Sequence, residues 1–161
     1  MTVKIFIRRD VSDIHARYAV FDEYENELYT VSGRNTASGE VMKVISSGFT
    51  QAKIRDLRLP VLTAYVISVK AESVKLFFTY RAGRIKARFS GISWRIRGDI
   101  LSGSFDIIDA DGTIVCCVYQ NFLKRYIELN VFDDNRELFC IAAALCVDAL
   151  NIERVPDLQM T

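Results

Sequence analysis

The chain has 161 residues, which is enough for one domain with a substantial hydrophobic core. Half of the residues are hydrophobic and a quarter are charged, so the composition excludes a disordered chain. The 21 basic and 20 acidic residues give a net charge of +1, which excludes a protein that binds polyanions with its whole surface. We therefore treat residues 1–161 as a single domain, in which a nucleic-acid or membrane role requires a local patch.

The N-terminal residues MTVKIFIRRDVSD lack the apolar core and the small-residue cleavage site of a signal peptide. No apolar run reaches the roughly 18 residues that a membrane-spanning helix requires. The four cysteines lie among apolar residues at spacings that do not suit a metal site. We predict that these are reduced cysteines in the core of a cytoplasmic protein. If the protein acts at a membrane, we expect it to bind there peripherally.

The first β-rich segment is Tyr18–Val31, in which two runs of strand-forming residues flank a polar turn. The segment Phe105–Val118 repeats this plan 87 residues later, with an aspartate at the end of the first strand in each copy. Its turn, DADG, is a good hairpin signal. The repeat predicts two similar β-units in one domain. We do not expect calcium at DADG, because no further ligands follow at the required offsets.

Five further strand candidates lie between the two copies: EVMKVI, TAYVISV, VKLFFTY, RIKARFSG and SWRIRG. Strict alternation places the cations of RIKARF and WRIR on the outward face of each strand. From Arg81 to Arg97 there are six cations and no acidic residue. If the two strands pair, their outward faces form a positive patch. Besides Arg81, its members are Arg84, Lys86, Arg88, Arg95 and Arg97.

The segment Asn135–Leu150, NRELFCIAAALCVDAL, contains ten consecutive apolar residues, Leu138–Val147. At about 100° per residue these side chains cover the full circumference of a helix, so the helix is either buried on all sides or spans a membrane. Ten apolar residues are too few to span a membrane. We predict a buried helix over about 134–151, with an N-cap among residues 133–135 and Glu137 in its first turn.

The surroundings of this helix must be β-sheet, because no other segment has a convincing helical period. A sheet that surrounds a helix has to curl into a barrel, and closure also removes exposed strand edges. The lengths agree, since such a helix is about 27 Å long and a strand of about eight residues spans a similar distance. Asp148 is the polar exception in the helix, and we expect it to reach the barrel mouth or to meet an arginine there.

Three segments, in this order, resemble the LURP-one-related (YxjI-type) family of the Tubby C-terminal-like superfamily: WRIRGDILSGSFDIIDADGTIVCCV, KRYIELNVFDD and LFCIAAALCVDAL. The resemblance covers most of the chain and is strongest over residues 94–150. The fold that it implies is mainly β, a closed antiparallel barrel of about twelve strands threaded by a hydrophobic C-terminal helix. This agrees with the barrel inferred from the helix.

The superfamily also offers functional precedents. Tubby-type domains bind phosphoinositides through basic surface residues, phospholipid scramblases act at membranes, and plant LURP-one proteins are linked to defence. No tubby-style lipid-contact motif aligns residue by residue with this sequence, and the Pro-rich tail of scramblases is absent. The resemblance therefore implies a class of function and assigns no residue to it.

Three functional hypotheses remain open. The first is a non-enzymatic barrel that binds an anionic ligand or phospholipid head groups through the five cations between Arg84 and Arg97, because arginine is a forked, permanently charged donor to phosphate. The competing interpretation is that these cations aid solubility and pair with Asp99, Asp106 and an acidic turn. This turn carries Asp22, Glu23, Glu25 and Glu27. The second hypothesis is a protein-interaction or scaffold domain. The third is an enzyme with an unrecognised surface site. Nucleic acid is not expected, since no exposed aromatic residues are interleaved with the cations.

We predict no catalytic, metal or cofactor-binding residue. His15, the single histidine, lies in the polar stretch SDIHARY and is more typical of a surface or turn residue than of a general base. No Gly-rich phosphate loop, nucleophile elbow or zinc-type spacing is present in the sequence. A barrel filled by a helix has no interior cavity, so a ligand site must lie on the outer surface or at a barrel mouth.

Overall fold

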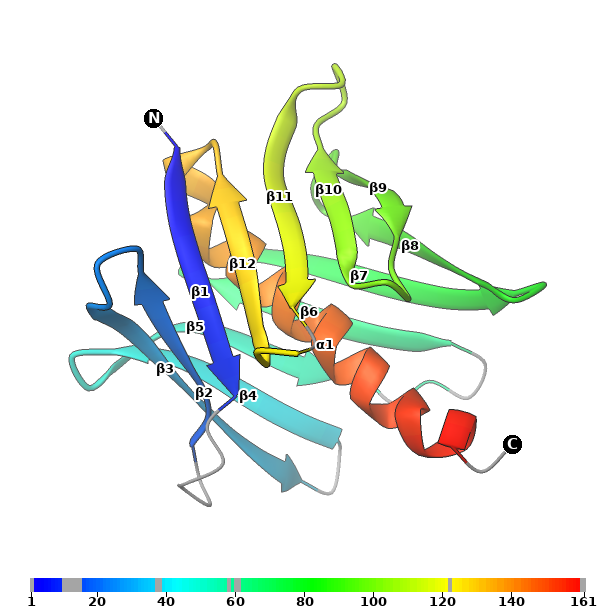
Figure 1. Ribbon diagram of the computed structural model, residues 1–161, viewed down its shortest axis with the longest axis horizontal. Coiled ribbons are helices and arrows are strands. Elements are labelled where there is room, and N and C mark those ends of the chain that lie inside the picture. The colour runs from blue at the N-terminus through cyan, green and yellow to red at the C-terminus, as the bar shows by residue number, and fades with distance from the viewer. Residues whose placement is uncertain are drawn as a thin grey trace.

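The computed structural model describes residues 2–9, 16–36, 39–57, 59, 62–121 and 123–159, without the side chains of residues 16, 34–36 and 152–159. The described chain forms twelve strands, a short 3₁₀ helix and one long α-helix (Figure 1). In chain order these are β1 (Val3–Arg9), β2 (Ala16–Asp22), β3 (Glu27–Thr36), β4 (Gly39–Ser46), β5 (Phe49–Asp56), β6 (Thr63–Val69), β7 (Glu72–Arg81), β8 (Arg84–Ser90), β9 (Arg95–Asp99), β10 (Ser104–Ile108), β11 (Ile114–Asn121), β12 (Tyr126–Val131), η1 (Asp134–Arg136) and α1 (Glu137–Gln159).

All twelve strands belong to one antiparallel sheet, which curls around α1 into a nearly closed barrel (Figure 1). The order in the sheet is β8-β7-β6-β5-β4-β3-β2-β1-β12-β11-β10-β9, so that β1 and β12 are hydrogen-bonded neighbours. The mainly β fold predicted from the sequence is confirmed. The predicted closure is incomplete, because β8 and β9 form no ladder with each other and are the two edges of the sheet.

The core lies between the sheet and the helix because alternate residues of each strand point inward. In β1, for example, Ile5 and Ile7 are buried, whereas Lys4 and Phe6 on the other face are partly exposed. This period of two is the pattern of a sheet with one buried face. The inward residues of the sheet and the residues of α1 form a single hydrophobic cluster.

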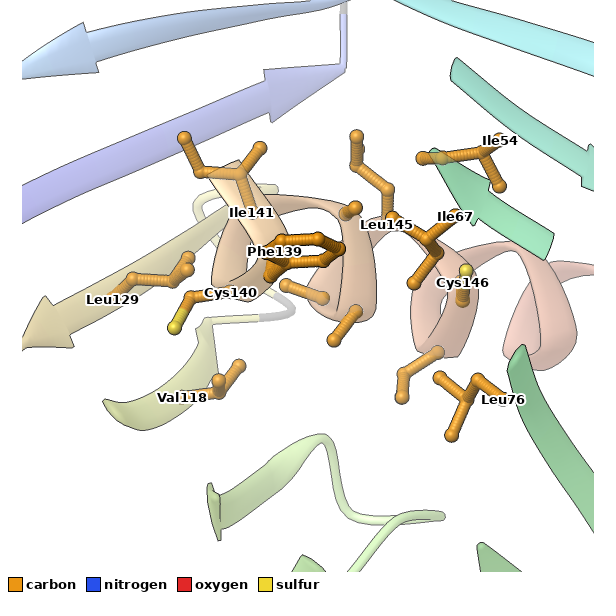
Figure 2. Packing of buried hydrophobic residues seen from close by; sticks show 14 of the residues in the cluster. Ile54, Ile67, Leu76, Val118, Leu129, Phe139, Cys140, Ile141, Leu145 and Cys146 are labelled. Carbon is orange, nitrogen blue, oxygen red and sulfur yellow. The ribbon is translucent and has the colours of Figure 1, made fainter. Parts of the chain in front are cut away.

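The helix is buried on all sides, as its composition predicts. Every side chain from Phe139 to Asp148 is buried. Figure 2 shows wall residues that approach α1 from different directions, with Val118 and Leu129 near its N-terminal part and Ile54, Ile67 and Leu76 farther along. The predicted N-cap is also present: the Asp133 carboxylate accepts a hydrogen bond from the Asn135 amide at 3.1 Å. The helix continues past the predicted end near residue 151 to Gln159, with Pro156 inside this last stretch.

The two repeated segments fold into hairpins with the same register. Tyr18 faces Val31 in β2–β3, and Phe105 faces Val118 in β10–β11. Each hairpin has an irregularity at the same place, after Val20 in one copy and after Ile107 in the other. The turns match as well, since each closing aspartate donates its amide to the carbonyl four residues ahead. The predicted internal similarity of the two β-units is therefore confirmed in their backbone hydrogen bonds.

One position differs in residue type between these two turns. Glu25 has a φ of 66° and the equivalent Gly112 has a φ of 86°. Glycine occupies this left-handed region at little cost, whereas a residue with a side chain is strained there. The backbone of the second turn is therefore less strained at this position than that of the first.

Among the described residues, neither helix combines the length and the apolar content that crossing a bilayer requires.

Candidate functional site

The five cations predicted as an anion-binding site lie on the outward faces of β8 and β9, and all five are exposed. Between them, Phe89 and Ile96 point toward the core side. The two strands do not pair, so the predicted patch is not one continuous sheet surface. It consists of two unpaired edges that are joined by residues 91–94. We call these five residues the basic edges: Arg84, Lys86, Arg88, Arg95 and Arg97.

Two of the five basic-edge residues have partners within the sheet. Arg97 forms an ion pair with Asp106 on β10, with an Nη2–Oδ2 distance of 3.1 Å. The guanidinium of Arg88 lies 5.2 Å from the centre of the Phe77 ring, which faces it on β7. Among the described residues, the other three, Arg84, Lys86 and Arg95, form no ion pair. The predicted pairing with Asp106 is correct for Arg97, whereas the acidic turn after β2 pairs with Arg8 through Glu25 at 3.7 Å.

A second group of polar residues gathers at a barrel mouth around Asp148, which is 2 % exposed. The carboxylate accepts hydrogen bonds at 3.1 and 3.0 Å from Nη2 of Arg9 at the end of β1. It also accepts one at 2.6 Å from the Tyr18 hydroxyl on β2 and one at 3.1 Å from Nε2 of Gln120 on β11. The expectation that Asp148 meets an arginine at the mouth is correct. Its four bonds join three strands to the helix.

Burial and charge set the protonation of this group. Burial raises the pKa of Tyr18, and the negative charge of Asp148 and the hydrogen bond between the two raise it further. The hydroxyl therefore keeps its proton and acts as a donor to the carboxylate. Arg9 neutralises the charge of Asp148 while its own side chain is 45 % exposed. The result is a fully bonded carboxylate with a partly exposed guanidinium above it.

This arrangement borders a pocket of about 420 Å³. Arg125, in the turn before β12, contributes a second cation to the pocket wall. The lining thus carries two cations and one carboxylate, together with apolar and aromatic surface. The lining residues are Ile7, Arg9, Tyr18, Gln120, Asn121, Arg125, Tyr126, Ile127 and Asp148.

The sequence predicts only part of this mouth. The arginine partner of Asp148 was expected, but Arg9 could not be singled out, since 139 residues separate the two in the chain. The role of Tyr18 does have a signal in the sequence. Tyr18 matches Phe105 in the repeat, so its hydroxyl is the feature that the second copy lacks. Gln120 and Arg125 carry no signal of their own.

The cysteines are free thiols, and three of them are buried: Cys116, Cys140 and Cys146. The pKa of Cys140 is raised by a hydrogen bond with Cys116 and by burial, and that of Cys146 is raised by burial. Burial and Asp106 raise the pKa of the half-buried Cys117 to about 11. Cys117, Cys140 and Cys146 are therefore poor nucleophiles at neutral pH. The part of the chain that the structure describes holds no cluster of three metal-ligating side chains, and His15 lies outside it.

Comparison with known proteins shows where this fold belongs. The family model described as LURP-one-related matches residues 3–148. YxjI of Bacillus subtilis (strain 168), which is described as uncharacterised, is 24 % identical over 155 residues, covering 91 % of this chain and 92 % of that protein. An Arabidopsis thaliana protein of known X-ray structure has the same fold, with a TM-score of 0.65 at 11 % identity over 93 % of this chain and 91 % of that one. The chain therefore belongs to the LURP-one-related family.

Proposed function

We propose that this domain is a non-enzymatic binding module that holds anionic phospholipid head groups through the basic edges, at the cytoplasmic side of a membrane. The observation that carries the proposal is the exposure of five outward-facing cations on the two edge strands, three of which form neither an ion pair nor a cation–π contact among the described residues. Such cations attract phosphate without first losing a partner. The domain needs no catalytic group for this role.

The net charge of +1 makes the location of these cations the important point, because the protein as a whole has almost no attraction for an anionic surface. Each lysine or arginine near an anionic leaflet contributes about 1 kcal/mol of attraction. Arg84, Lys86 and Arg88 follow one strand at every second residue, so they reach the same side together. Their summed attraction gives the domain an orientation as well as an affinity.

A structural explanation competes with this proposal. Unpaired sheet edges invite pairing with other chains, and charged side chains on an edge strand prevent it. The basic edges lie on the two edge strands of the sheet, so protection of the edges would account for their charge without any ligand. An experiment must therefore separate lipid binding from solubility.

Flotation with vesicles makes this separation. The wild-type protein and the variant Arg84→Glu/Lys86→Glu/Arg88→Glu are mixed with vesicles of phosphatidylcholine alone or of phosphatidylcholine with phosphatidylserine. We expect the wild type to float only with the anionic vesicles and to be released by salt. The variant should bind at least about tenfold more weakly, since three attractions become repulsions.

A matched control uses three cations elsewhere on the outer wall. Lys43, Lys53 and Arg55 lie on β4 and β5, and changing all three to Glu alters the net charge by the same amount. This control should float like the wild type. The proposal would be overturned if the two variants bound the anionic vesicles to the same extent, whether both kept or both lost binding. It would also be overturned if the wild type did not float.

A second candidate function, protein interaction, is favoured by the two unpaired edges themselves. β8 and β9 present backbone groups to which an extended segment of another protein can add as a strand. Affinity capture from the native source, with the wild type and the Arg84→Glu/Lys86→Glu/Arg88→Glu variant as baits, distinguishes the two functions. A partner retained by both baits, together with no flotation of the wild type, favours the interaction role.

A further inference from the structure

We propose that the pocket at the barrel mouth binds a small amphipathic carboxylate, with its oxyanion between Arg9 and Arg125 and its apolar part against the neighbouring strand residues. This site is separate from the basic edges, because its residues come from β1, β2, the β11–β12 hairpin and α1. The proposal therefore does not depend on lipid binding at the edges.

Hydrogen bonds fix the buried side of the pocket in the absence of a ligand. Asp148 is buried in the helix and is held by Arg9, Tyr18 and Gln120 at distances between 2.6 and 3.1 Å. Because both bonds from Arg9 leave the same terminal nitrogen, the guanidinium is oriented while its other N–H groups donate to no described residue. A guanidinium held in this way loses little conformational freedom when it binds an anion.

The charge of the lining selects the class of ligand. Arg9 and Arg125 provide two positive charges and Asp148 one negative charge, so a single negative charge on the ligand completes the balance. A carboxylate carries one charge and accepts two parallel hydrogen bonds from a guanidinium. A phosphate monoester carries close to two charges and would leave one of them uncompensated near Asp148. A cation would meet two arginines.

The apolar and aromatic residues of the lining suit an apolar body on the ligand, and Gln120 and Asn121 add polar groups. Ile127 is buried next to the opening, and Tyr126 adds a partly exposed aromatic ring. The volume of about 420 Å³ falls within the usual range of about 300–1,000 Å³ for small-molecule sites.

The test uses the full chain labelled with ¹⁵N and titrated with octanoate. Octanamide serves as the neutral ligand of matching shape, octylamine as the cation and octyl phosphate as the more highly charged anion. We expect octanoate to shift the side-chain signals of Arg9 and Gln120. Octanamide and octylamine should bind at least about tenfold more weakly, because each loses the charged hydrogen bonds.

Arg125 is the residue to change first, because Arg9 also stabilises buried Asp148 and its removal would weaken the fold. Arg125 has a φ of 59°, so Arg125→Asn removes the charge while keeping a residue that tolerates the left-handed region. Lys124→Asn is the matched control, since this exposed neighbour in the same turn does not line the pocket. Octanoate affinity should fall about tenfold in Arg125→Asn and remain unchanged in Lys124→Asn.

The outcomes separate this site from the basic edges. The Arg84→Glu/Lys86→Glu/Arg88→Glu variant should keep its octanoate affinity, and Arg125→Asn should still float with anionic vesicles. The proposal is overturned if octanoate does not bind, if octanamide binds equally well, or if Arg125→Asn binds like the wild type. Tighter binding of octyl phosphate than of octanoate would overturn the assignment of a carboxylate.

Discussion

β1 and β12 pair although they lie at opposite ends of the strand series, whereas β8 and β9, only four residues apart in the chain, do not pair. On the paired side, the inward residues are apolar and Lys4 meets Glu128 on the outer face at 3.3 Å. On the unpaired side, five of the outward residues are cations, three on β8 and two on β9. Like charges on facing strands oppose pairing, and opposite charges support it. Closeness in the chain is therefore less decisive here than complementary side chains.

Breaking the paired side should cost the most stability. Leu129 on β12 is fully buried, and Leu129→Ala should lower the free energy of unfolding by about 2–5 kcal/mol. Ile85 on β8 is only partly buried, so Ile85→Ala should cost about 1 kcal/mol. Urea denaturation of the two variants measures the difference. Equal losses would mean that the unpaired side contributes as much to the barrel as the paired side.

The mouth next to the paired side should show the next largest effect. Asp148→Ala leaves the buried Tyr18 hydroxyl without its acceptor, whereas Arg9 can turn to water. We expect the free energy of unfolding to fall by about 2–3 kcal/mol, because the Tyr18 hydroxyl stays buried without an acceptor and Arg9 loses its ion pair. Tyr18→Phe should cost about 1 kcal/mol, because Asp148 keeps its other donors.

The double variant Asp148→Ala/Tyr18→Phe tests whether these effects share one interaction. It should lose less stability than the sum of the two single changes, because the hydroxyl left unbonded in Asp148→Ala is absent from the double variant. Urea denaturation of all four proteins gives the coupling. Strict additivity would show that the hydrogen bond between Tyr18 and Asp148 contributes nothing.

Alkaline pH should weaken the contact between the strands and the start of the helix. The Tyr29 hydroxyl donates to Glu137 at 3.0 Å, and burial and the Glu137 charge raise its pKa to about 12. This contribution to stability is fully present below pH 10 and is lost as the pH rises from 10 to 12, because the unfolded chain loses this proton first. Since Tyr29 is about half buried and solvent screens the charge, we expect a loss of about 1 kcal/mol.

Tyr29→Phe is the control for this pH dependence. Its free energy of unfolding should fall less steeply than that of the wild type between pH 10 and 12, with the difference following the titration of one group. Parallel curves for the two proteins would show that another group, such as Tyr18, accounts for the whole alkaline loss.

The smallest effect is expected on the unpaired side. Arg97 and Asp106 form an exposed pair, and Arg97→Ala should cost between 0 and about 1 kcal/mol. Arg95→Ala is the matched control, because Arg95 forms no ion pair with a described acid, and it should change stability by about 0.5 kcal/mol at most. A loss well above 1 kcal/mol in Arg97→Ala would identify this pair as a main support of the β9–β10 edge.

The burial of the helix and the two hairpins could be predicted because each depends on residues that are close together in the chain. The apolar run Leu138–Val147 has no polar side, so its environment follows from its own composition. The repeat likewise carries its register and its turn within 14 residues of each copy. Asp148 was expected to reach the mouth for the same local reason, as the polar residue that ends the run.

The opening between β8 and β9 and the pocket could not be predicted in this way. Alternation assigns Arg84 and Arg97 to outward faces but does not state which strands pair. The pocket is lined by Arg9, Asp148 and Arg125, which come together only because β1 pairs with β12 and α1 passes beside them. A site built from distant segments has no local spacing to reveal it.

The central position of α1 has a consequence for synthesis. The element around which every strand packs is translated after all twelve of them, and β1 also waits for β12 as its neighbour. Until both emerge from the ribosome, the inward faces of the earlier strands have no permanent cover, and a nascent chain in that state is prone to aggregate. Contacts of such long separation also slow folding. This domain therefore completes its fold late, when its last segment enters the barrel, and depends on protection from other chains until then.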